Sequence, residues 1–136
     1  MIHYSDSLEN LKAEQLEGFF VGWPNSPSPE THLRILQGSY KVWLAFDADR
    51  VVGFINATSD GVLTAFIPLL EVLPDYQGQG IGAELTKPML QSLKHLYSVD
   101  LICDESVQAF YEKLGMRPFS GMIWRNYENQ GGVPPN

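Results

Sequence analysis

The sequence PDYQGQGIGAEL, residues 74–85, brings three glycines into five residues directly before a run that favours a helix. The first N–H groups of a helix have no intrahelical acceptor, and the positive end of the helix dipole also favours negative charge. Glycines at Gly78, Gly80 and Gly82 would let an anionic group approach these donors, because no Cβ stands in the way. The stretch therefore predicts an anion-binding loop at the start of a helix.

Two familiar phosphate-binding loops do not fit this stretch. A Walker loop ends in Gly-Lys-Ser or Gly-Lys-Thr, and neither occurs in the sequence. The dinucleotide fingerprint G-x-G-x-x-A is satisfied by Gly78, Gly80 and Ala83, but its βαβ unit normally opens a domain of several such units. Only 54 residues follow Gly82, and the acidic residue after the next predicted strand, Asp104, begins a helix instead of contacting a ribose. The context thus argues against a dinucleotide-binding fold.

The interpretation that remains is a glycine loop that leaves an antiparallel sheet and opens one long helix. In this arrangement the backbone N–H groups of residues 79–83 point at an anion such as a pyrophosphate. The alternative is a tight strand-to-helix turn that holds no ligand.

Length and composition are those of one globular domain. The chain has 136 residues, of which 44% are hydrophobic and 18% charged. Cys103 is the only cysteine, so no internal disulfide forms, and no Cys/His spacing suggests zinc. The N-terminus MIHYSDSLEN lacks the features of a signal peptide, and no apolar run is long enough to span a membrane. We expect a single domain over residues 1–136, with residues 129–136 as a loose tail, in the reducing cytoplasm.

The charge balance is acidic. Sixteen acidic residues against nine basic ones give a net charge of −7. Such a chain repels a phosphate backbone, so nucleic acid is not an expected partner, whereas a cationic small molecule or a basic peptide would be attracted. An acidic surface that only maintains solubility is the alternative explanation.

Three runs of alternating or β-branched residues predict an antiparallel meander. The turn DADR separates the first two runs, and Asp60-Gly61 is a strong signal for a two-residue hairpin before the third. Pro68 cannot donate to a strand ladder and therefore predicts a bulge, or a place where pairing opens. The predicted strands cover residues 42–46, 51–59 and 62–73.

Helical spacing of apolar residues predicts the remaining secondary structure. Glycines at Gly22, Gly38 and Gly115 are expected to end three helices, and Asp104 is expected to cap the last one. Pro88 lies inside a predicted helix and should bend it. These elements are, in chain order, a short strand at the N-terminus, helices at 8–22, 29–38 and 83–97, a buried strand at 99–103, a helix at 104–115 and a closing hairpin at 116–128.

Two motifs resemble those of the Gcn5-related N-acetyltransferase (GNAT) superfamily. QGQGIG, residues 77–82, matches the family motif Q/R-x-x-G-x-G/A, and DESVQAFYEKLGMRPF, residues 104–119, resembles the later motif N-x-x-A-x-x-F-Y-x-x-x-G-F. The predicted order of elements also fits that fold, from about residue 40 to residue 127. The resemblance implies an α+β GNAT (acyl-CoA N-acyltransferase) fold. This fold has a mixed, mostly antiparallel sheet, splayed between its fourth and fifth strands and flanked by helices.

The resemblance also implies acetyl-CoA as co-substrate and no metal. The glycine loop would hold its pyrophosphate through backbone amides, and the backbone of the preceding strand would pair with the pantetheine arm like an additional strand. The residues implied to contact the cofactor are Leu70, Glu71, Val72, Gln77, Gly78, Gln79, Gly80, Ile81, Gly82, Ala83, Asp104 and Tyr111.

Two of these residues are implied to be catalytic. The N–H of Leu70 would stabilise the oxyanion that develops on the thioester carbonyl. Tyr111, in AFYEKLG, matches a tyrosine that lies near the sulfur of CoA in many members, where it would protonate the leaving thiolate. The alternative for Tyr111 is packing on an amphipathic helix beside Phe110 and Leu114.

The sequence departs from the family pattern at other positions. Asp104 stands where the family often has Asn, so it either contacts the pantetheine or only caps its helix. Phe66 and Pro68 occupy the positions where some relatives carry a Glu or His base, and neither side chain accepts a proton. Glu71 is close by, but strand alternation turns it to the face opposite Leu70. We therefore expect no general base among the side chains of this strand, with Glu71 as the alternative.

The resemblance implies an N-acetyltransferase that moves acetyl from acetyl-CoA to a primary amine of a small molecule or peptide, by direct attack in a ternary complex. The alternative is an acyl-CoA-binding sensor of the same fold without turnover. The segments at 22–30 and 116–126 are expected to shape the acceptor pocket. The identity of the acceptor and the oligomeric state stay open, with a homodimer as one option.

Overall fold

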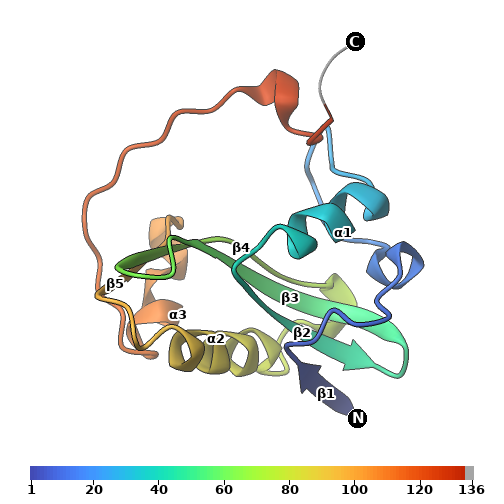
Figure 1. Ribbon diagram of the computed structural model, residues 1–136, viewed down its shortest axis with the longest axis horizontal. Helices are drawn as coiled ribbons and strands as arrows, with labels where there is room; N and C mark the ends of the chain where they lie inside the picture. Colours follow the sequence, from blue (N-terminus) through green and yellow to red (C-terminus); the bar gives the residue numbers. More distant parts are fainter. Residues whose placement is uncertain (134–136) are drawn as a thin grey trace.

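The computed structural model describes residues 1–133 of the chain (Figure 1). Its centre is a five-stranded sheet in which the strands lie side by side in chain order, β1-β2-β3-β4-β5. The first four are antiparallel, and β5 runs parallel to β4. This mixed sheet with flanking helices confirms the predicted α+β class. The strands are β1 (Ile2–Ser5), β2 (Lys41–Asp47), β3 (Arg50–Ser59), β4 (Thr64–Val72) and β5 (Ser98–Asp100).

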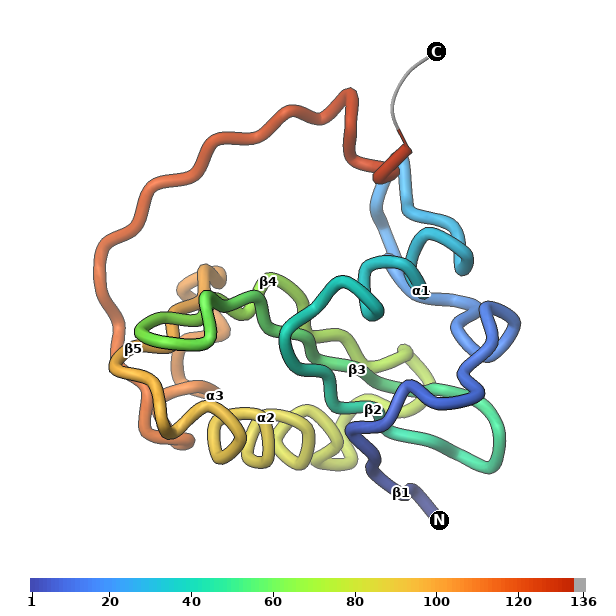
Figure 2. The backbone as a smooth tube through the Cα atoms, viewed as in Figure 1, coloured from blue at the N-terminus to red at the C-terminus, as the bar shows by residue number. Residues whose placement is uncertain are grey.

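Helices cover both faces of this sheet (Figures 1 and 2). On one face, a Cβ added at Gly53 of β3 would meet the side chains of Leu85 and Ile81 from α2. The next residue along β3, Phe54, packs on the opposite face against His32 of α1, because successive strand residues point to opposite sides. The helices are α1 (Pro29–Gln37), α2 (Ile81–Ser92) and α3 (Gln108–Glu112), with 3₁₀ turns η1 (Ala13–Leu16), η2 (Pro74–Tyr76), η3 (Glu105–Val107) and η4 (Tyr127–Asn129).

Both long helices form where the sequence places them. In α1 the Oγ of Ser28 accepts the N–H of Thr31, proline occupies the first position, and Gly38 follows the last turn. In α2 the apolar face that includes Leu85 and Met89 is fully buried. The C-terminal end of α2 was predicted too far along the chain, because the helix stops at Ser92 and not at residue 97.

The irregularity that Pro68 predicts is present in β4. The register between β3 and β4 shifts between Asn56 and Thr58, where β4 has one residue more than β3. On its other side β4 is paired with β5 only at residues 64–66. Beyond the bulge, β4 therefore has a strand neighbour on one side alone, and the sheet opens between β4 and β5.

The predicted helix over residues 8–22 is wrong. Only the single turn η1 forms, because Asn10, Gly18, Phe20 and Gly22 all adopt positive φ angles that a right-handed helix cannot contain. Its apolar residues still reach the core, and Leu16 is buried. The segment behaves as an irregular loop that is fastened to the sheet by its side chains.

The predicted two-residue hairpin at Asp60-Gly61 is a longer loop. The strands end at Ser59 and resume at Thr64, so four residues connect them. The Asp60 carboxylate accepts the N–H groups of Val62, Leu63 and Thr64, which lowers the pKa of this carboxyl below its ordinary value. Asp60 therefore organises a wider turn than the dipeptide signal indicated.

The C-terminal part differs most from the prediction. The strand predicted at 99–103 ends at Asp100, and the helix predicted at 104–115 consists of η3 followed by the short α3. The closing hairpin at 116–128 does not form. Residues 117–126, here called the arm, have no helix or strand and are all exposed. Figures 1 and 2 show the arm swinging from the α3 side of the molecule across to the α1 side.

The chain beyond the arm returns to the N-terminal part of the fold. Asn25 donates its N–H to Oε1 of Gln130 at 3.1 Å, and a Cβ at Gly132 would lie 2.9 Å from the Thr31 side chain. Residues 129–133 are therefore held against the body and are not the loose tail that we expected. The rest of that predicted tail, residues 134–136, lies outside the described residues.

Candidate active site

The glycine loop presents a row of unpaired backbone donors. Gly80 is the N-cap of α2 with φ of 82°, and its carbonyl accepts the first helical bond, from the N–H of Glu84. Within the described part of the chain, no protein group accepts the N–H groups of residues 78–83. These donors lie at the positive end of the helix dipole, where an anion is favoured. They belong to Gly78, Gln79, Gly80, Ile81, Gly82 and Ala83.

The three glycines of the loop meet two different structural requirements. Gly78 and Gly80 have φ angles of 77° and 82°, which side-chain-bearing residues rarely adopt, and a Cβ at either would meet open space. A Cβ at Gly82 would instead lie 3.4 Å from the ring of Phe110 on α3. The first two glycines allow the turn, and the third allows α2 and α3 to pack closely.

Two side-chain hydrogen bonds fix the loop to the sheet. The amide Nε2 of Gln77 donates to the carbonyl of Val72 at the end of β4, at 3.0 Å. The hydroxyl of Tyr76 donates to the carboxylate of Asp47 on β2, which raises the pKa of the tyrosine. The position of the free N–H groups relative to the sheet is thus set by two polar contacts of the residues that precede the glycines, one to β2 and one to β4.

The open stretch of β4 directs backbone groups away from the rest of the sheet. Leu73 donates its N–H to Val52 of β3, and in an antiparallel ladder such bonds recur at every second residue. Glu71 consequently shares its backbone bonds with its partner on β3, Phe54. By the same alternation, the backbone groups of Leu70 and Val72 face the side where β4 has no strand neighbour.

The Glu71 carboxylate is occupied by another part of the chain. Its Oε1 accepts the N–H of Phe20 at 2.8 Å, and its Oε2 lies 3.3 Å from the N–H of Val21. These bonds fasten the irregular N-terminal segment to β4. Glu71 therefore has a structural task in addition to any contact with a ligand.

A cavity of about 450 Å³ lies where β4 and β5 diverge. Tyr111 of α3 borders it on one side and Leu70 on the other. Burial raises the pKa of the Tyr111 hydroxyl above its ordinary value, with a smaller contribution from Cys103. The cavity is lined by Val21, Trp23, Phe54, Ile67, Pro68, Leu69, Leu70, Glu71, Pro74, Gln77, Leu101, Ile102 and Tyr111.

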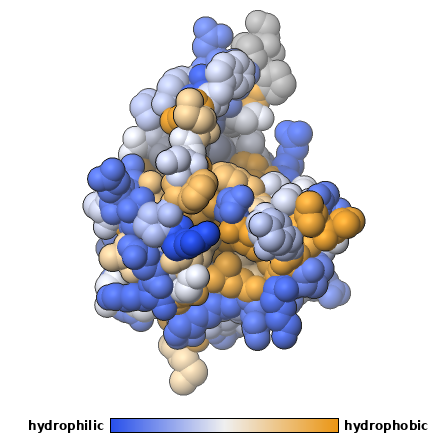
Figure 3. Space-filling model, turned by 90° about the vertical axis from the view of Figure 1, so that its left-hand side faces the viewer, coloured by the Kyte–Doolittle hydropathy of each residue, from blue (hydrophilic) through white to orange (hydrophobic). Residues whose placement is uncertain are grey.

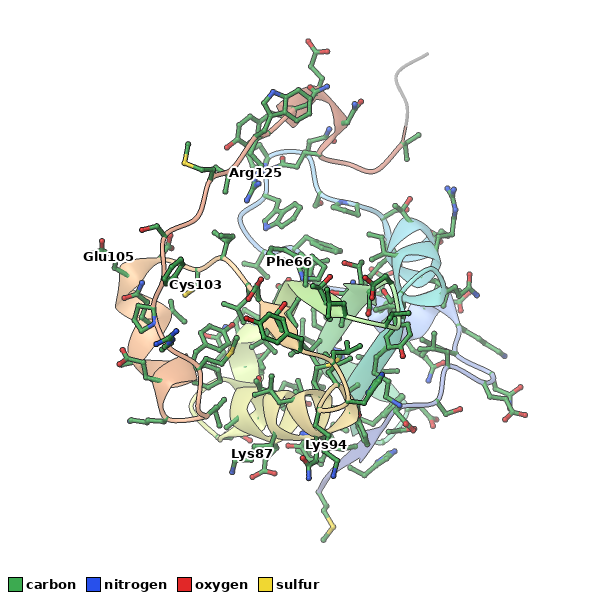
Figure 4. All side chains as sticks on the ribbon, turned by 60° about the vertical axis from the view of Figure 1, so that its left-hand side comes forward. Phe66, Lys87, Lys94, Cys103, Glu105 and Arg125 are labelled. Atoms are coloured by element: carbon green, nitrogen blue, oxygen red, sulfur yellow. The ribbon has the colours of Figure 1, made fainter. Side chains whose placement is uncertain are left out.

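Other predicted residues lie at the margin of this cavity or outside it. Phe66 is exposed on β4, and the half-buried Cys103 follows the end of β5 (Figure 4). Asp104 is exposed; it occupies the position before η3, but its side chain makes no capping bond, so the predicted cap is not formed. A direct role for Asp104 with a ligand stays a prediction.

The sequence predicted only part of the cavity wall that comes from the N-terminal loop. Trp23 lies in the segment 22–30 that was expected at the acceptor pocket, whereas Val21 was assigned to the end of a helix. The run of Gly18, Gly22 and Pro24 around these apolar residues was the available signal, because such punctuation is typical of a loop and not of a helix. The arm, by contrast, was expected at the acceptor pocket and does not line it.

A second cavity, of about 270 Å³, lies beside His32 on the other side of the N-terminal loop. His32 is only 1% exposed, and neither ring nitrogen has a hydrogen-bond partner. Its ring packs edge-on against Phe19, Phe20 and Phe54, and burial lowers its pKa to about 4. His32 is therefore an uncharged core residue at neutral pH.

The described residues contain neither a metal-binding cluster nor a helix suited to crossing a membrane. Among the described residues, no group of three or more His, Cys, Asp or Glu side chains is placed to hold a metal ion. Within residues 1–133, no helix combines the length and the apolar character that crossing a bilayer requires.

Comparison with known proteins identifies the family. The family model described as "Acetyltransferase (GNAT) domain" matches residues 8–126. An uncharacterized N-acetyltransferase of Pyropia yezoensis is 30% identical over 132 residues, covering 89% of this chain and 76% of the relative.

Solved structures agree with this match. A crystal structure of a protein from Deinococcus radiodurans, named there as a candidate acetyltransferase, is 47% identical. It superposes with a TM-score of 0.94, covering 98% of this chain and 94% of the other. A GNAT-family acetyltransferase from Streptococcus pneumoniae is 36% identical with a TM-score of 0.76, covering 93% and 98% of the two chains. The GNAT family generally uses acetyl-CoA. This chain is a member of the GNAT acetyltransferase family.

Proposed function

We propose that this chain transfers acetyl from acetyl-CoA to a primary amine of a small molecule or peptide, by direct attack in a ternary complex. One observation carries the proposal. The unpaired stretch of β4 lies next to a row of free N–H groups at the start of α2, and Gln77 joins the two through its bond to Val72. A ligand with an amide-containing arm and a pyrophosphate at its end fits this combination.

The backbone groups available to the cofactor can be stated individually. The pyrophosphate accepts the free N–H groups of residues 79–83. The pantetheine arm lies along β4 as an additional strand and pairs with the carbonyl of Leu70 and with the N–H of Val72, while the N–H of Leu70 is left for the thioester. The carbonyl of Val72 already accepts one hydrogen bond, from Gln77. Glu71 contributes no backbone donor, since its N–H faces β3.

The chemistry uses two groups of the chain. The neutral amine attacks the thioester carbonyl, so that a C–N bond forms, and the N–H of Leu70 stabilises the oxyanion. The C–S bond then breaks, Tyr111 donates its proton to the departing thiolate, and the attacking nitrogen loses its extra proton to solvent to give the neutral amide. Because burial raises its pKa, Tyr111 is protonated at neutral pH and able to act as this acid. Solvent returns the proton to the tyrosine afterwards.

No side chain on β4 is free to take the proton of the amine. Phe66 and Pro68 are not bases, and both carboxylate oxygens of Glu71 face backbone N–H groups of Phe20 and Val21. The ammonium form of the acceptor therefore loses its proton to solvent before the attack. The neutral fraction of the amine then sets the rate at limiting acceptor concentration.

The acceptor side of the cavity combines apolar walls with an acidic protein. Val21 and Trp23 offer apolar and aromatic surface, and the net charge of −7 attracts an ammonium group. Both features are compatible with a small cationic amine or with the side chain or terminus of a peptide. The single cysteine, Cys103, agrees with a reducing compartment such as the cytoplasm.

The test measures binding and turnover separately. Acetyl-CoA and desulfo-CoA should raise the melting temperature of the protein, whereas NADH should not. With acetyl-CoA and a panel of amines, free thiol should appear together with an acetylated amine identified by mass spectrometry. Binding without thiol release for any amine would favour the acyl-CoA sensor. Stabilisation by NADH equal to that by acetyl-CoA would contradict both interpretations.

A further inference from the structure

The arm is an apolar segment that pairs with no strand among residues 1–133. Phe119 is 90% exposed, Met122 96% and Trp124 87%. These side chains belong to the segment for which the sequence predicts strands. Figure 3 shows an apolar area on the face of the molecule that carries β5 and the arm. An exposed apolar segment of this kind marks an interaction site in a soluble protein.

The edge of the sheet beside the arm also lacks a partner. β5 is the last strand of the sheet, and it pairs with β4 on one side only. It ends at Asp100, although the sequence predicts a strand as far as Cys103, and Ile102 is left exposed. A free strand edge is a template on which another extended chain can add. The two segments that were predicted as strands here but form none, residues 101–103 and the arm, therefore both lack a neighbouring strand.

The arm cannot supply that strand to its own β5. It approaches Ile102 at one point, Gly121, where a Cβ would lie 2.7 Å from the isoleucine side chain. It then leaves and is held on the far side of the molecule, where Asn25 bonds Gln130. Figure 4 accordingly shows Arg125, on the arm, well away from Cys103 and Glu105 of the same chain.

We propose that the arm of each copy lies along the free β5 edge of a second copy of this chain, in a reciprocal, two-fold symmetric dimer. The chain carries both halves of this contact, an unpaired strand-forming arm and an unpaired edge. A surface that is complementary to itself closes into an isologous dimer. Main-chain bonds to the partner's arm then extend β5 toward Cys103, and the exposed apolar side chains become buried.

Charge supports a second copy as the occupant. The arm contains Arg117 and Arg125 and no acidic residue. Residues 98–105, which form and follow β5, contain Asp100, Asp104 and Glu105 and no basic residue. In the reciprocal dimer each basic arm meets the acidic segment of the other copy, whereas two like-charged segments would repel.

The crystal structure from Deinococcus radiodurans superposes on this chain with a TM-score of 0.94 over 98% of its residues, a coverage that includes most of the arm. An extended apolar segment keeps one path only if contacts compensate the entropy of ordering it. Among the described residues, the arm approaches its own chain at Gly121 and is followed by the bond at Gln130, so a second copy supplies the remaining contacts along it.

The dimer has a consequence for the active site, and this consequence rests on the proposed function. Leu101 and Ile102 line the cavity between β4 and β5 and also follow the free edge of β5. The partner's arm would therefore complete the outer wall of the acceptor pocket. Loss of the dimer should raise KM for the amine while leaving the affinity for acetyl-CoA in place.

The first experiment measures the mass of the protein in solution by light scattering. The wild type should have about twice the chain mass of 15.3 kDa. The double variant Ile123→Asp/Trp124→Asp should be monomeric, with the dissociation constant raised about a hundredfold or more, as expected for losing central apolar anchors. The matched control is Val62→Asp, which alters an apolar side chain that is 78% exposed on the β3–β4 loop. This control should remain dimeric.

A wild type that is monomeric at all accessible concentrations would overturn the proposal. So would an arm variant that stays dimeric. This measurement does not depend on catalysis, so its outcome is separate from that of the acetyl-transfer assay. A dimer that turns over no amine would leave the interface intact and contradict only the proposed function.

The second experiment locates the arm and does not require a destabilising change. Because Cys103 is the only cysteine, a chain with Cys103→Ser and a new cysteine at position 123, 124 or 125 can form a 103-to-arm disulfide only with a second, wild-type chain. A size tag on one chain distinguishes the mixed dimer from disulfides between identical chains. We expect the mixed disulfide to predominate for at least one arm position. Its absence at all three positions would place the arm elsewhere.

Discussion

The side-chain amide of Gln77 donates to the backbone carbonyl of Val72 at 3.0 Å, and this bond joins the glycine loop to the open end of β4. The two surfaces that the proposed cofactor must contact at once are thus held by one side chain. The bond also occupies one of the two acceptor positions of the Val72 carbonyl.

Replacing Gln77 by Ala should weaken acetyl-CoA binding about three- to tenfold, the usual value of a hydrogen bond of about 0.5–1.5 kcal/mol. The loop would lose its fixed distance from β4, while the helix and the strand would stay folded. Isothermal titration calorimetry measures the effect. Gln91→Ala, an exposed glutamine of α2 outside the loop, is the matched control and should bind normally. Equal affinity of the two variants would remove Gln77 from the site.

Gly80→Ala should lose cofactor affinity in excess of its loss of stability. The φ of 82° at Gly80 disfavours alanine by about 1 kcal/mol, and the new Cβ enters the open space beside the loop that a bound pyrophosphate would need. Gly115→Ala is the control, because Gly115 has φ of 97° and open space around it but lies outside the loop. Both variants should melt at similarly lowered temperatures, and only Gly80→Ala should lose CoA binding in a pull-down or calorimetric assay.

Tyr111→Phe should retain acetyl-CoA affinity and reduce kcat by about ten- to ten-thousand-fold, the range for a lost general acid. The change removes one hydroxyl and preserves the ring that packs beside Phe110. Steady-state thiol release with a fixed amine measures the effect, provided that chemistry limits the rate in the wild type. If kcat does not change under that condition, Tyr111 serves packing alone.

Glu71→Gln should lower stability without changing how the rate depends on pH. The carboxylate accepts two backbone N–H groups, and an amide can accept through one oxygen only, so the melting temperature should fall. At limiting amine, the rate of the wild type should rise with pH toward the pKa of the acceptor, and the rise should shift when an amine of lower pKa is used. Glu71→Gln should show the same rise. If the rise disappears while the fold survives, Glu71 is the general base.

Acid should destabilise the protein through His32. The pKa of this buried imidazole is lowered to about 4, whereas the unfolded chain has the ordinary value of 6.5. The unfolded state therefore binds a proton that the folded state refuses. The contribution of His32 to the free energy of unfolding is fully present above pH 6.5. It is lost as the pH falls toward 4, by about 3 kcal/mol in total.

Urea unfolding between pH 7 and pH 4 measures this loss. His32→Leu should flatten the part of the pH dependence that belongs to His32. His95→Leu, which replaces an exposed histidine, should leave the part that belongs to His32 in place. Identical acid sensitivity of wild type and His32→Leu would contradict the assignment.

Local sequence signals identified the parts of this protein that depend on neighbours in the chain. The glycine loop was predictable because Gly78 and Gly80 require backbone conformations that other residues disfavour. The bulge in β4 was predictable because Pro68 has no N–H to donate. The bounds of α1 and the buried face of α2 were predictable from short-range signals. For the same reason, the family motifs at 77–82 and 104–119 could be recognised without a structure.

Contacts between distant segments decided the rest. Residues 8–22 have the apolar spacing of a helix, yet they form a loop because the N–H groups of Phe20 and Val21 bind Glu71, about fifty residues away. That bond also brings Trp23 to the cavity, and it assigns Glu71 a structural task that no spacing rule contains. The arm shows the same limit. Its residues favour strands by themselves, but a strand needs a neighbour to share its hydrogen bonds. Whether that neighbour exists depends on where the chain returns, and here the bond between Asn25 and Gln130 holds the arm away from β5.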